Sequence, residues 1–246
     1  SAFYALSVLP EDFHEWEYLA NSRTPEAYNK IVKGNADIIF VAQPSGGQKK
    51  RAEESGVTLI YTPFAREAFV FIVNVDNPVN SLTEQQVRDI FSGAITNWRT
   101  VGGNDQEIQT WQRPEDSGSQ TVMQSQVMKN VRMISPQETE VASMMEGMIK
   151  VVAEYRNTNN AIGYTFRYYA TQMNADKNIK LLAINGIAPT AENIRNGKYP
   201  YIVDAFMVTR ENMTSETQKL VEWFLTPQGQ SLVEDVGYVP MYKTLH

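Results

Sequence analysis

The chain has 246 residues, enough for one large domain or for two smaller ones that each bury a core. Its apolar fraction of 42% and aromatic fraction of 11% are those of a globular protein, and no apolar run approaches the roughly 18 residues that a membrane span needs. The formal net charge of −6 argues against a nucleic-acid partner, which would favour a basic surface, and it opposes anion binding in bulk. Any anion site must therefore depend on local donors, such as backbone amides and one or two arginines.

The residue types that usually carry metal and nucleophile chemistry are scarce. The absence of cysteine removes disulfides, thiolate metal sites and cysteine nucleophiles. His14 and His246 are far apart in the sequence and lack partners at ligand spacing. We therefore expect no metal site, no cofactor and no enzyme activity. A phosphate-ester hydrolase is the weakest alternative, because Ser117 has no histidine or lysine in its local sequence to activate it.

The first half of the chain predicts an alternation of helices and strands. Thr24 and Pro25 indicate a helix start, with a capping hydroxyl followed by a proline at the first helical position, and Asn35 ends that helix. The segments expected after it are a strand at 36–42, a helix at 48–54, strands at 57–61 and 67–74, and a helix at 81–92.

The alternation continues in the second half. The expected segments are a strand at 107–112, a helix that reaches about 130, a helix at 138–156, strands at 161–166, 179–184 and 201–208, and closing helices at 215–225 and 227–237. Such alternation favours an α/β fold with mostly parallel sheets. Ligands of such folds usually lie beyond the carboxyl ends of the strands, so the loops after strands are the places to search for a site.

One of these loops, WQRPEDSGSQT, has the composition of an oxyanion site. Arg113 follows the strand and offers a fork of donors to two oxygens of one anion. Ser117, Gly118 and Ser119 stand at the start of the next helix, where free backbone amides and the helix dipole favour negative charge.

An ordinary structural reading of the same loop has about even weight on the local pattern alone. Ser117 would then be a common helix cap and Gly118 a turn residue, while Arg113 and Glu115 would form a solvated pair.

Several motifs together resemble one family. The motifs are RPEDSGSQT, SRTPEAY, ADIIFVAQPS, SGAITNW, AIGYTFRYY and WFLTPQGQSLVEDVGYVP. Together they resemble the phosphate-binding protein of Pst-type ABC importers, and the resemblance covers nearly the whole chain. It implies a type II periplasmic-binding-protein fold, in which two α/β lobes are joined by two crossover strands and close on a ligand in the cleft between them.

The same resemblance implies the lobe boundaries. Residues 1–72 and 185–246 would form lobe I and residues 73–184 lobe II, with hinge strands at 67–74 and 201–208. Members of the family begin with a strand and a glycine, serine and threonine loop. This chain is expected to start at the end of that loop, so that the strand is missing from lobe I and Ser1 is a remnant of the loop.

The family's site residues carry over by position. Arg113 matches the arginine that grips phosphate, Ser117, Gly118 and Ser119 match the surrounding loop, and Glu115 matches the acid beside the arginine. From lobe I, the resemblance implies a helix-capping role for Thr24 and a second cation at Arg23, although Arg23 reads equally well as a solvated surface residue. Gln43 stands where the family has a carboxylate after the second strand.

Gln43 bears on which oxyanion is bound. A carboxylate can only accept hydrogen bonds, so it favours protonated phosphate and repels sulfate, whereas an amide does not repel a fully deprotonated anion. Discrimination against sulfate would then either depend on Glu115 or be weaker. The expected function is the binding of inorganic phosphate for an ABC importer, and the alternatives are another oxyanion such as sulfate, or a ligand-free or sensory relative that acts through protein contacts.

The resemblance also implies the protein's setting. The expected partners are inorganic phosphate and the membrane permease of the importer, with no nucleic acid, and the chain is expected to be a monomer. Its expected location is extracytoplasmic, either periplasmic or at the cell surface, with lipid anchoring left open and the signal segment outside this chain.

Overall fold

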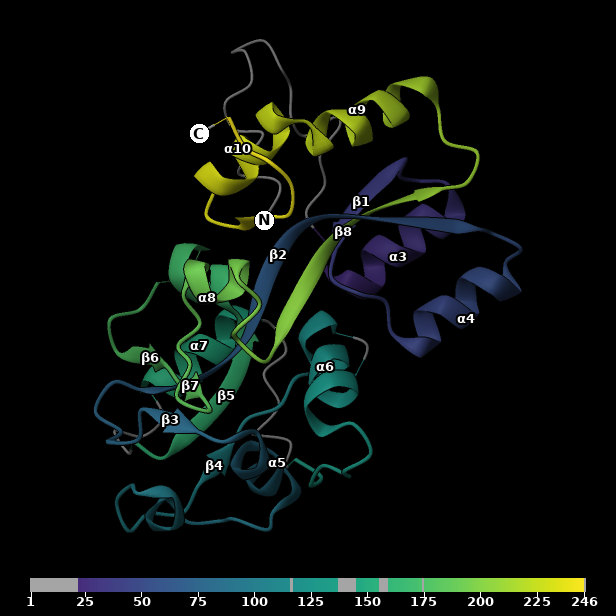
Figure 1. Ribbon diagram of the computed structural model, residues 1–246. Coiled ribbons are helices and arrows are strands. Elements are labelled where there is room, and N and C mark those ends of the chain that lie inside the picture. Colours follow the sequence, from purple (N-terminus) through teal and green to yellow (C-terminus); the bar gives the residue numbers. More distant parts are fainter. Residues whose placement is uncertain (1–21, 116, 137–144, 155–158, 174, 246) are drawn as a thin grey trace. The chain divides into compact units, whose positions relative to one another are not determined.

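The computed structural model describes residues 22–115, 117–136, 145–154, 159–173 and 175–245 (Figure 1). The chain divides into two compact units. The first consists of the described parts of Ser1–Arg66, Asp116–Gly118 and Asp204–His246, and the second of the described parts of Glu67–Glu115 and Ser119–Val203. The lobe boundaries expected at 72/73 and 184/185 remain a prediction.

In its described part, the first unit combines a small sheet with four helices. Its elements are α3 (Thr24–Lys33), β1 (Ile38–Val41), α4 (Gly46–Glu54), the start of β2 (Leu59–Asn74), most of β8 (Ile202–Arg210), α9 (Ser215–Leu225), α10 (Pro227–Asp235) and β9 (Val239–Pro240). The strand order is β1-β8-β2, with β9 paired to β2. Aromatic side chains fill the core, where the rings of Phe40, Phe64 and Phe224 meet edge to face with centroids 5.3 to 5.7 Å apart.

A buried glutamine joins the C-terminal part of the chain to this core. The amide of Gln230 donates to the carbonyls of Phe64 and Phe224 at 2.9 and 2.8 Å, and its oxygen accepts the amides of Met241 and Tyr242 at 2.8 and 2.9 Å. A fully bonded amide avoids the desolvation penalty of a buried polar group. The motif WFLTPQGQS is therefore explained by packing in this unit.

The second unit is larger and holds the candidate loop apart from the segment Asp116–Gly118. Its strands are the end of β2, β3 (Ser81–Leu82), β4 (Gln109–Thr110), β5 (Ala161–Phe166), β6 (Ile179–Leu181) and β7 (Ala183–Ile184). Its helices are α5 (Glu84–Ser92), the 3-10 helix η1 (Trp98–Val101), α6 (Gly118–Val122), the π-helices η2 (Met123–Met128) and η5 (Tyr169–Met173), α7 (Met145–Glu154) and α8 (Ala191–Arg195). The sheet order is β2-β5-β4, β6 also pairs with β2, and β3 pairs with β7 in a separate two-stranded sheet.

Close packing in this unit depends on one glycine in the motif AIGYTFRYY. A Cβ atom at Gly163 of β5 would lie 2.3 Å from Met148 Sδ of α7, so any other residue would force the Met148 side chain to shift. Met148 itself is fully buried, as expected of a core methionine.

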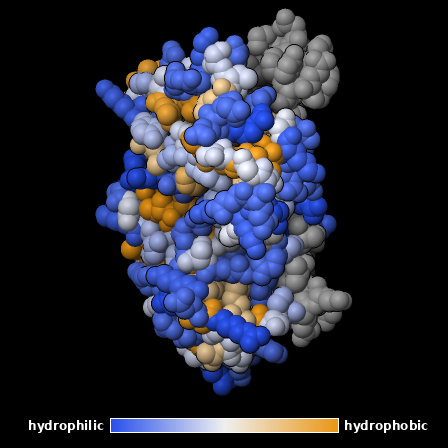
Figure 2. Space-filling view, turned by 90° about the vertical axis from the view of Figure 1, so that its right-hand side faces the viewer, coloured by the Kyte–Doolittle hydropathy of each residue, from blue (hydrophilic) through white to orange (hydrophobic). Residues whose placement is uncertain are grey.

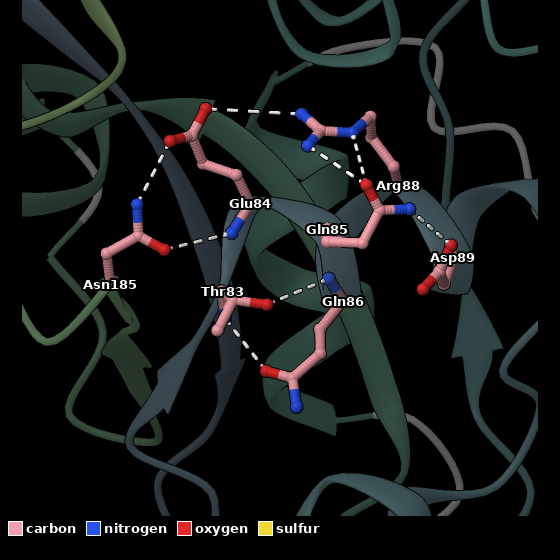
Figure 3. Close-up of polar contacts among 7 residues, drawn as sticks. All are labelled: Thr83, Glu84, Gln85, Gln86, Arg88, Asp89 and Asn185. Atoms are coloured by element: carbon pink, nitrogen blue, oxygen red, sulfur yellow. Dashed lines mark hydrogen bonds and ion pairs between the residues drawn. The ribbon is translucent and has the colours of Figure 1, made fainter.

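Helix α5 is fixed at its start by a closed polar network (Figure 3). Thr83 and Gln86 form a capping box, in which each side chain accepts the backbone amide of the other residue at 3.1 and 2.8 Å. Asn185, after β7, accepts the amide of Glu84 at 3.2 Å and donates to its carboxylate at 3.0 Å. The network therefore ties the helix start to a segment about a hundred residues later in the chain.

Strand direction differs from the sequence-based prediction. The expectation of mostly parallel sheets is wrong for the described strands, because β1 with β8, and β2 with β5, β6 and β9, are antiparallel. Only β3 with β7 and β4 with β5 are parallel among these described pairs. The single 16-residue strand β2 serves as a partner in both units and runs antiparallel to β5, β6 and β9.

The two short strands expected at 57–61 and 67–74 are parts of this single strand. Pro63 does not interrupt it, because proline has an extended φ and is tolerated where a strand needs no amide donor.

Two helix predictions also need correction. Arg23, and not Thr24, is the N-cap of α3, because the Arg23 carbonyl accepts the Ala27 amide at 2.9 Å and the helix begins at Thr24. Its other end is Gly34, which adopts a φ of 76°, rather than Asn35. The helix at 138–156 is described only as α7, since residues 137–144 and 155–158 lie outside the described part of the chain.

One face of the molecule is mainly polar where it is described (Figure 2). Figure 2 shows hydrophilic residues over most of the visible face, interrupted by separate hydrophobic patches. Among the described residues, no helix has the length and apolarity to cross a membrane.

Candidate anion site

The candidate loop joins β4 to α6 in the way that the sequence predicts. Strand β4 pairs in parallel with β5, and the amide of Trp111 continues the ladder by donating to the carbonyl of Ile162 at 2.9 Å. Arg113 lies just beyond this point, and α6 begins at Gly118. The strand, loop and helix arrangement around the expected site is confirmed.

Arg113 is held in place by its backbone and is only 8% exposed. Its amide donates to the hydroxyl of Tyr164 at 3.1 Å and to the side-chain oxygen of Gln120 at 3.4 Å, and the Tyr164 hydroxyl donates to the same Gln120 oxygen. Burial lowers the pKa of the Arg113 guanidinium, and the phenols of Tyr164 and Tyr169 oppose that change. An anion beside the guanidinium would offset the cost of burying its charge.

Ser119 supplies a second buried polar group on the same loop. It is 2% exposed, and within the described chain its Oγ atom has no hydrogen-bond partner. A buried hydroxyl without a partner costs free energy, so such an atom at a helix start is a candidate ligand donor. Gly118 is buried and Ser117 is partly buried, whereas Asp116 lies outside the described residues.

Glu115 is placed differently from the buried part of the loop. Its carboxylate is exposed and accepts the side-chain amide of Gln124 at 3.0 and 3.2 Å. Gln124 belongs to η2, the π-helix that continues α6. The acid therefore stands at the rim of the loop, where Gln124 orients it.

A hollow of about 360 Å³ lies beside the loop in the second unit. Its lining includes Glu115, Gln120 and Gln124 together with the cations Lys129 and Arg132, but neither Arg113 nor Ser119. The hollow is thus a neighbour of the candidate site and not the site itself.

The candidates from the first unit have other surroundings. Arg23 is exposed and pairs with Glu26 at 2.8 Å, and the hydrogen bond from Arg23 lowers the pKa of that carboxyl. Thr24 begins α3, and Gln43 is partly buried in the segment after β1. The solvated reading of Arg23 fits this ion pair, while roles of Thr24 and Gln43 in ligand binding remain predictions. Ser1 lies outside the described residues, as do His14 and His246.

Sequence reasoning missed one buried acid. Glu67, the first residue of the second unit, is 4% exposed and accepts the amides of Ala68 and Tyr168 at 2.7 and 2.8 Å. Burial raises the pKa of its carboxyl to about 7, although both hydrogen bonds and the charge of Arg167 oppose the rise. The only signal in the sequence is a charged residue at the head of the apolar run AFVFIV.

The described residues contain no group of three or more metal-ligating side chains. The buried part of the β4–α6 loop offers hydrogen-bond donors, namely the Arg113 guanidinium, the Ser119 hydroxyl and helix-start amides, and Glu115 at its rim is an acceptor.

Comparison with known proteins gives the family. A family model described as the PBP superfamily domain matches residues 16–228, which is more than half of the chain. The chain belongs to the PBP superfamily. The resemblance deduced from the motifs is thereby confirmed.

Individual relatives agree with this assignment. The chain is similar to the phosphate-binding protein PstS of Bacillus subtilis, with 27% identity over 85% of this chain and 64% of that protein. It is also similar to the phosphate-binding protein PstS of Borreliella burgdorferi, with 26% identity over 86% of this chain and 74% of that protein. The chain thus spans less than two thirds of the length of the Bacillus subtilis relative.

A solved structure supports the fold. An ABC-type phosphate transport receptor from Vibrio cholerae matches with a TM-score of 0.66 and 23% identity, over 88% of this chain and 85% of that one. The expected α/β fold of type II periplasmic binding proteins is confirmed, with the correction to strand direction given above.

Proposed function

We propose that this chain binds inorganic phosphate through the β4–α6 loop and delivers it to the membrane permease of an ABC importer. The observation that carries the proposal is the pairing, on one loop, of a buried arginine with a buried serine hydroxyl that has no partner in the described chain. Groups of this kind are costly in an empty protein and useful in a protein that holds an anion.

The chemistry of the loop suits a tetrahedral dianion. Arg113 provides charge and a planar fork of donors, which two phosphate oxygens can accept together. Ser119 provides a hydroxyl donor, and the amides of Ser117 and Gly118 precede or begin a helix whose dipole favours negative charge. These groups do not distinguish phosphate from sulfate.

We assign the discrimination between phosphate and sulfate to a hydrogen-bond acceptor. Phosphate carries a proton near neutral pH and sulfate does not, so a carboxylate near the ligand favours phosphate. Glu115 is the acid of the loop, and Gln124 fixes its position. With Gln43 in place of a carboxylate in the first unit, Glu115 becomes the residue on which discrimination depends.

The relatives support the biological setting. Two of them are named phosphate-binding protein PstS, and the Vibrio cholerae structure is an ABC-type phosphate transport receptor. Binding proteins of this kind work outside the cytoplasm, and we assign this chain the same location and the role of a non-catalytic receptor. We further propose that its two lobes close on the ligand, so that Thr24 and Gln43 contribute from the first unit.

The proposal is tested by titrating the purified protein with phosphate and, separately, with sulfate. We expect saturable phosphate binding in the micromolar range or tighter, and much weaker sulfate binding. Glu115→Gln should reduce the preference for phosphate, whereas Glu54→Gln on the exposed face of α4 is a matched control that should leave it unchanged. A flat phosphate titration of the intact protein would refute the proposal, and equal affinities would reassign it to oxyanions in general.

A further inference from the structure

Glu67 occupies the position where the β2–β5 ladder stops. Phe69 pairs with Phe166, and the same antiparallel register continued by two residues places Glu67 opposite Tyr168. Here the chain after β5 turns into η5, and the Tyr168 amide donates to the Glu67 carboxylate at 2.8 Å. The Glu67 side chain thus bonds to the backbone just beyond the end of the β2–β5 ladder.

The two hydrogen bonds of Glu67 need its ionised form. The Ala68 amide donates to Oε1 at 2.7 Å and the Tyr168 amide to Oε2 at 2.8 Å, so each oxygen serves one donor. An ionised carboxylate accepts at both oxygens. Protonation converts one oxygen to a hydroxyl, which is a poorer acceptor and carries a hydrogen that needs its own partner.

The segment that Glu67 holds is the one that surrounds Arg113. Tyr169 follows Tyr168 directly, and its phenol acts on the Arg113 guanidinium. Tyr164, on β5, accepts the Arg113 amide at 3.1 Å. The Tyr164 hydrogen bond and the Tyr169 phenol that raises the pKa of Arg113 therefore both come from the chain between the start of β5 and the start of η5.

We propose that Glu67 is a positioning residue for the anion site and acts through Tyr168 and Tyr169. Its ionised carboxylate keeps Tyr169 beside Arg113, and uptake of a proton by Glu67 weakens phosphate binding. The inference rests on the proposed function and adds to it a dependence on pH that does not come from phosphate.

The relevant range is near neutral pH. Burial raises the pKa of Glu67 to about 7, and within the described chain the groups that oppose this are the Ala68 and Tyr168 amides and the charge of Arg167. Arg167 lies on the segment after β5, next to Tyr168, so its charge favours the same ionised form. Acidification from pH 8 to pH 6 should therefore release the Tyr168 amide.

The test compares phosphate affinity of the wild type and Glu67→Gln from pH 6 to pH 8. Glutamine keeps the shape but offers one acceptor oxygen, and it cannot titrate. Loss of one charge-assisted bond predicts affinity about 10-fold lower than wild type at pH 8, narrowing to about 2-fold at pH 6, where most wild-type Glu67 is protonated. The ionisation of phosphate affects both proteins equally, so it cancels in the ratio of the wild-type and Glu67→Gln affinities. Glu54→Gln on α4 controls for the loss of one negative charge, at an exposed position.

The outcomes separate the inference from the function on which it rests. The inference is overturned, and the function left intact, if the wild type binds phosphate but its affinity relative to that of Glu67→Gln does not change with pH. The same holds if the two affinities are equal. A wild type that does not bind phosphate at pH 8 overturns both.

A second measurement remains decisive if Glu67→Gln does not fold. Amide hydrogen exchange of the wild type should show that protection of the Tyr168 amide falls between pH 8 and pH 6, after correction for intrinsic exchange. The Thr165 amide, which faces Val70 in the β2–β5 ladder, is the internal control and should keep its protection. Equal behaviour of both amides contradicts the inference.

Discussion

Two helix starts in the second unit use similar residues for different purposes. The start of α5 has a threonine, an acid, a glutamine and an arginine, and its side chains bond to one another and to Asn185 (Figure 3). The start of α6 has a serine, an acid, a glutamine and an arginine nearby, but its arginine is buried and its Ser119 hydroxyl has no partner in the described chain. Residue composition therefore does not distinguish a structural helix start from one that binds a ligand. The distinguishing feature is whether the polar side chains already have hydrogen-bond partners within the protein.

The largest expected contrast is between the two arginines. Arg113→Ala should lower phosphate affinity about 100-fold or more, equivalent to about 3 kcal/mol, because it removes the buried cation of the site. Arg88→Ala removes the bonds to Gln85 and the 4.0 Å pair with Glu84, and should leave affinity unchanged. Calorimetric titration with phosphate measures the affinity of both variants. Equal affinities of Arg113→Ala and Arg88→Ala would remove the distinction between the starts of α6 and α5.

A second contrast sets the buried acid Glu67 against Glu84 of the α5 network. Because burial raises the pKa of Glu67 from 4.5 to about 7, the folded state binds more protons than the unfolded state between these values, and stability falls as pH rises through that range. The fall is at most about 3 kcal/mol and levels off above pH 7.

Urea unfolding at pH 5 and pH 8 measures this effect. Glu67→Gln should remove the part of the pH dependence that comes from Glu67, whereas Glu84→Gln, at a partly exposed position, should change it less. An unchanged pH dependence in Glu67→Gln would contradict the assignment.

The third contrast is between the hydroxyls of Ser119 and Thr83. Removal of the first should affect phosphate affinity, and removal of the second should affect stability. Ser119→Ala should weaken phosphate binding about 5- to 10-fold and change stability little, because its Oγ has no partner to lose within the described residues. Thr83→Ala should cost about 1 kcal/mol of stability through loss of the α5 cap and should not alter binding. Phosphate titration and thermal unfolding give the affinity and the stability of each variant. If Ser119→Ala loses stability but keeps its phosphate affinity, Ser119 is an ordinary structural serine.

The smallest effect is expected at Arg23. Its guanidinium is exposed and paired with Glu26 within α3, so Arg23→Ala should change phosphate affinity by less than about 2-fold. A loss comparable with that of Arg113→Ala would show that Arg23 leaves Glu26 to serve as a second ligand cation.

Much of the fold was predictable because local patterns were strong. The strand at 161–166 and the helix at 215–225 match β5 and α9 at both ends. Thr83 and Gln86 form a capping box that marks the start of α5 in the sequence, whereas the apolar periodicity alone predicts a helix from 81. The single strand β2 is predicted as two strands, because its apolar runs at 57–61 and 67–74 are separated by a more polar stretch.

The site was predictable only as a loop. Its residues are contiguous, so the motif locates Arg113 and Ser119 without knowledge of the fold. Burial and partners are tertiary properties: the hydroxyl that receives the Arg113 amide comes from Tyr164, and the amide bonded to Glu67 comes from Tyr168, 101 residues away. No local pattern contains these contacts, which explains why Glu67 was missed.

The most direct test of the binding loop is an NMR titration of the isotope-labelled protein with phosphate. We predict saturable shifts that are largest at the amides of Gly118 and Ser119, with the amides of Glu84 and Gln86 at the start of α5 nearly unchanged. Saturable shifts centred on α5, or no shifts at either helix start, would contradict the assignment of phosphate to the β4–α6 loop.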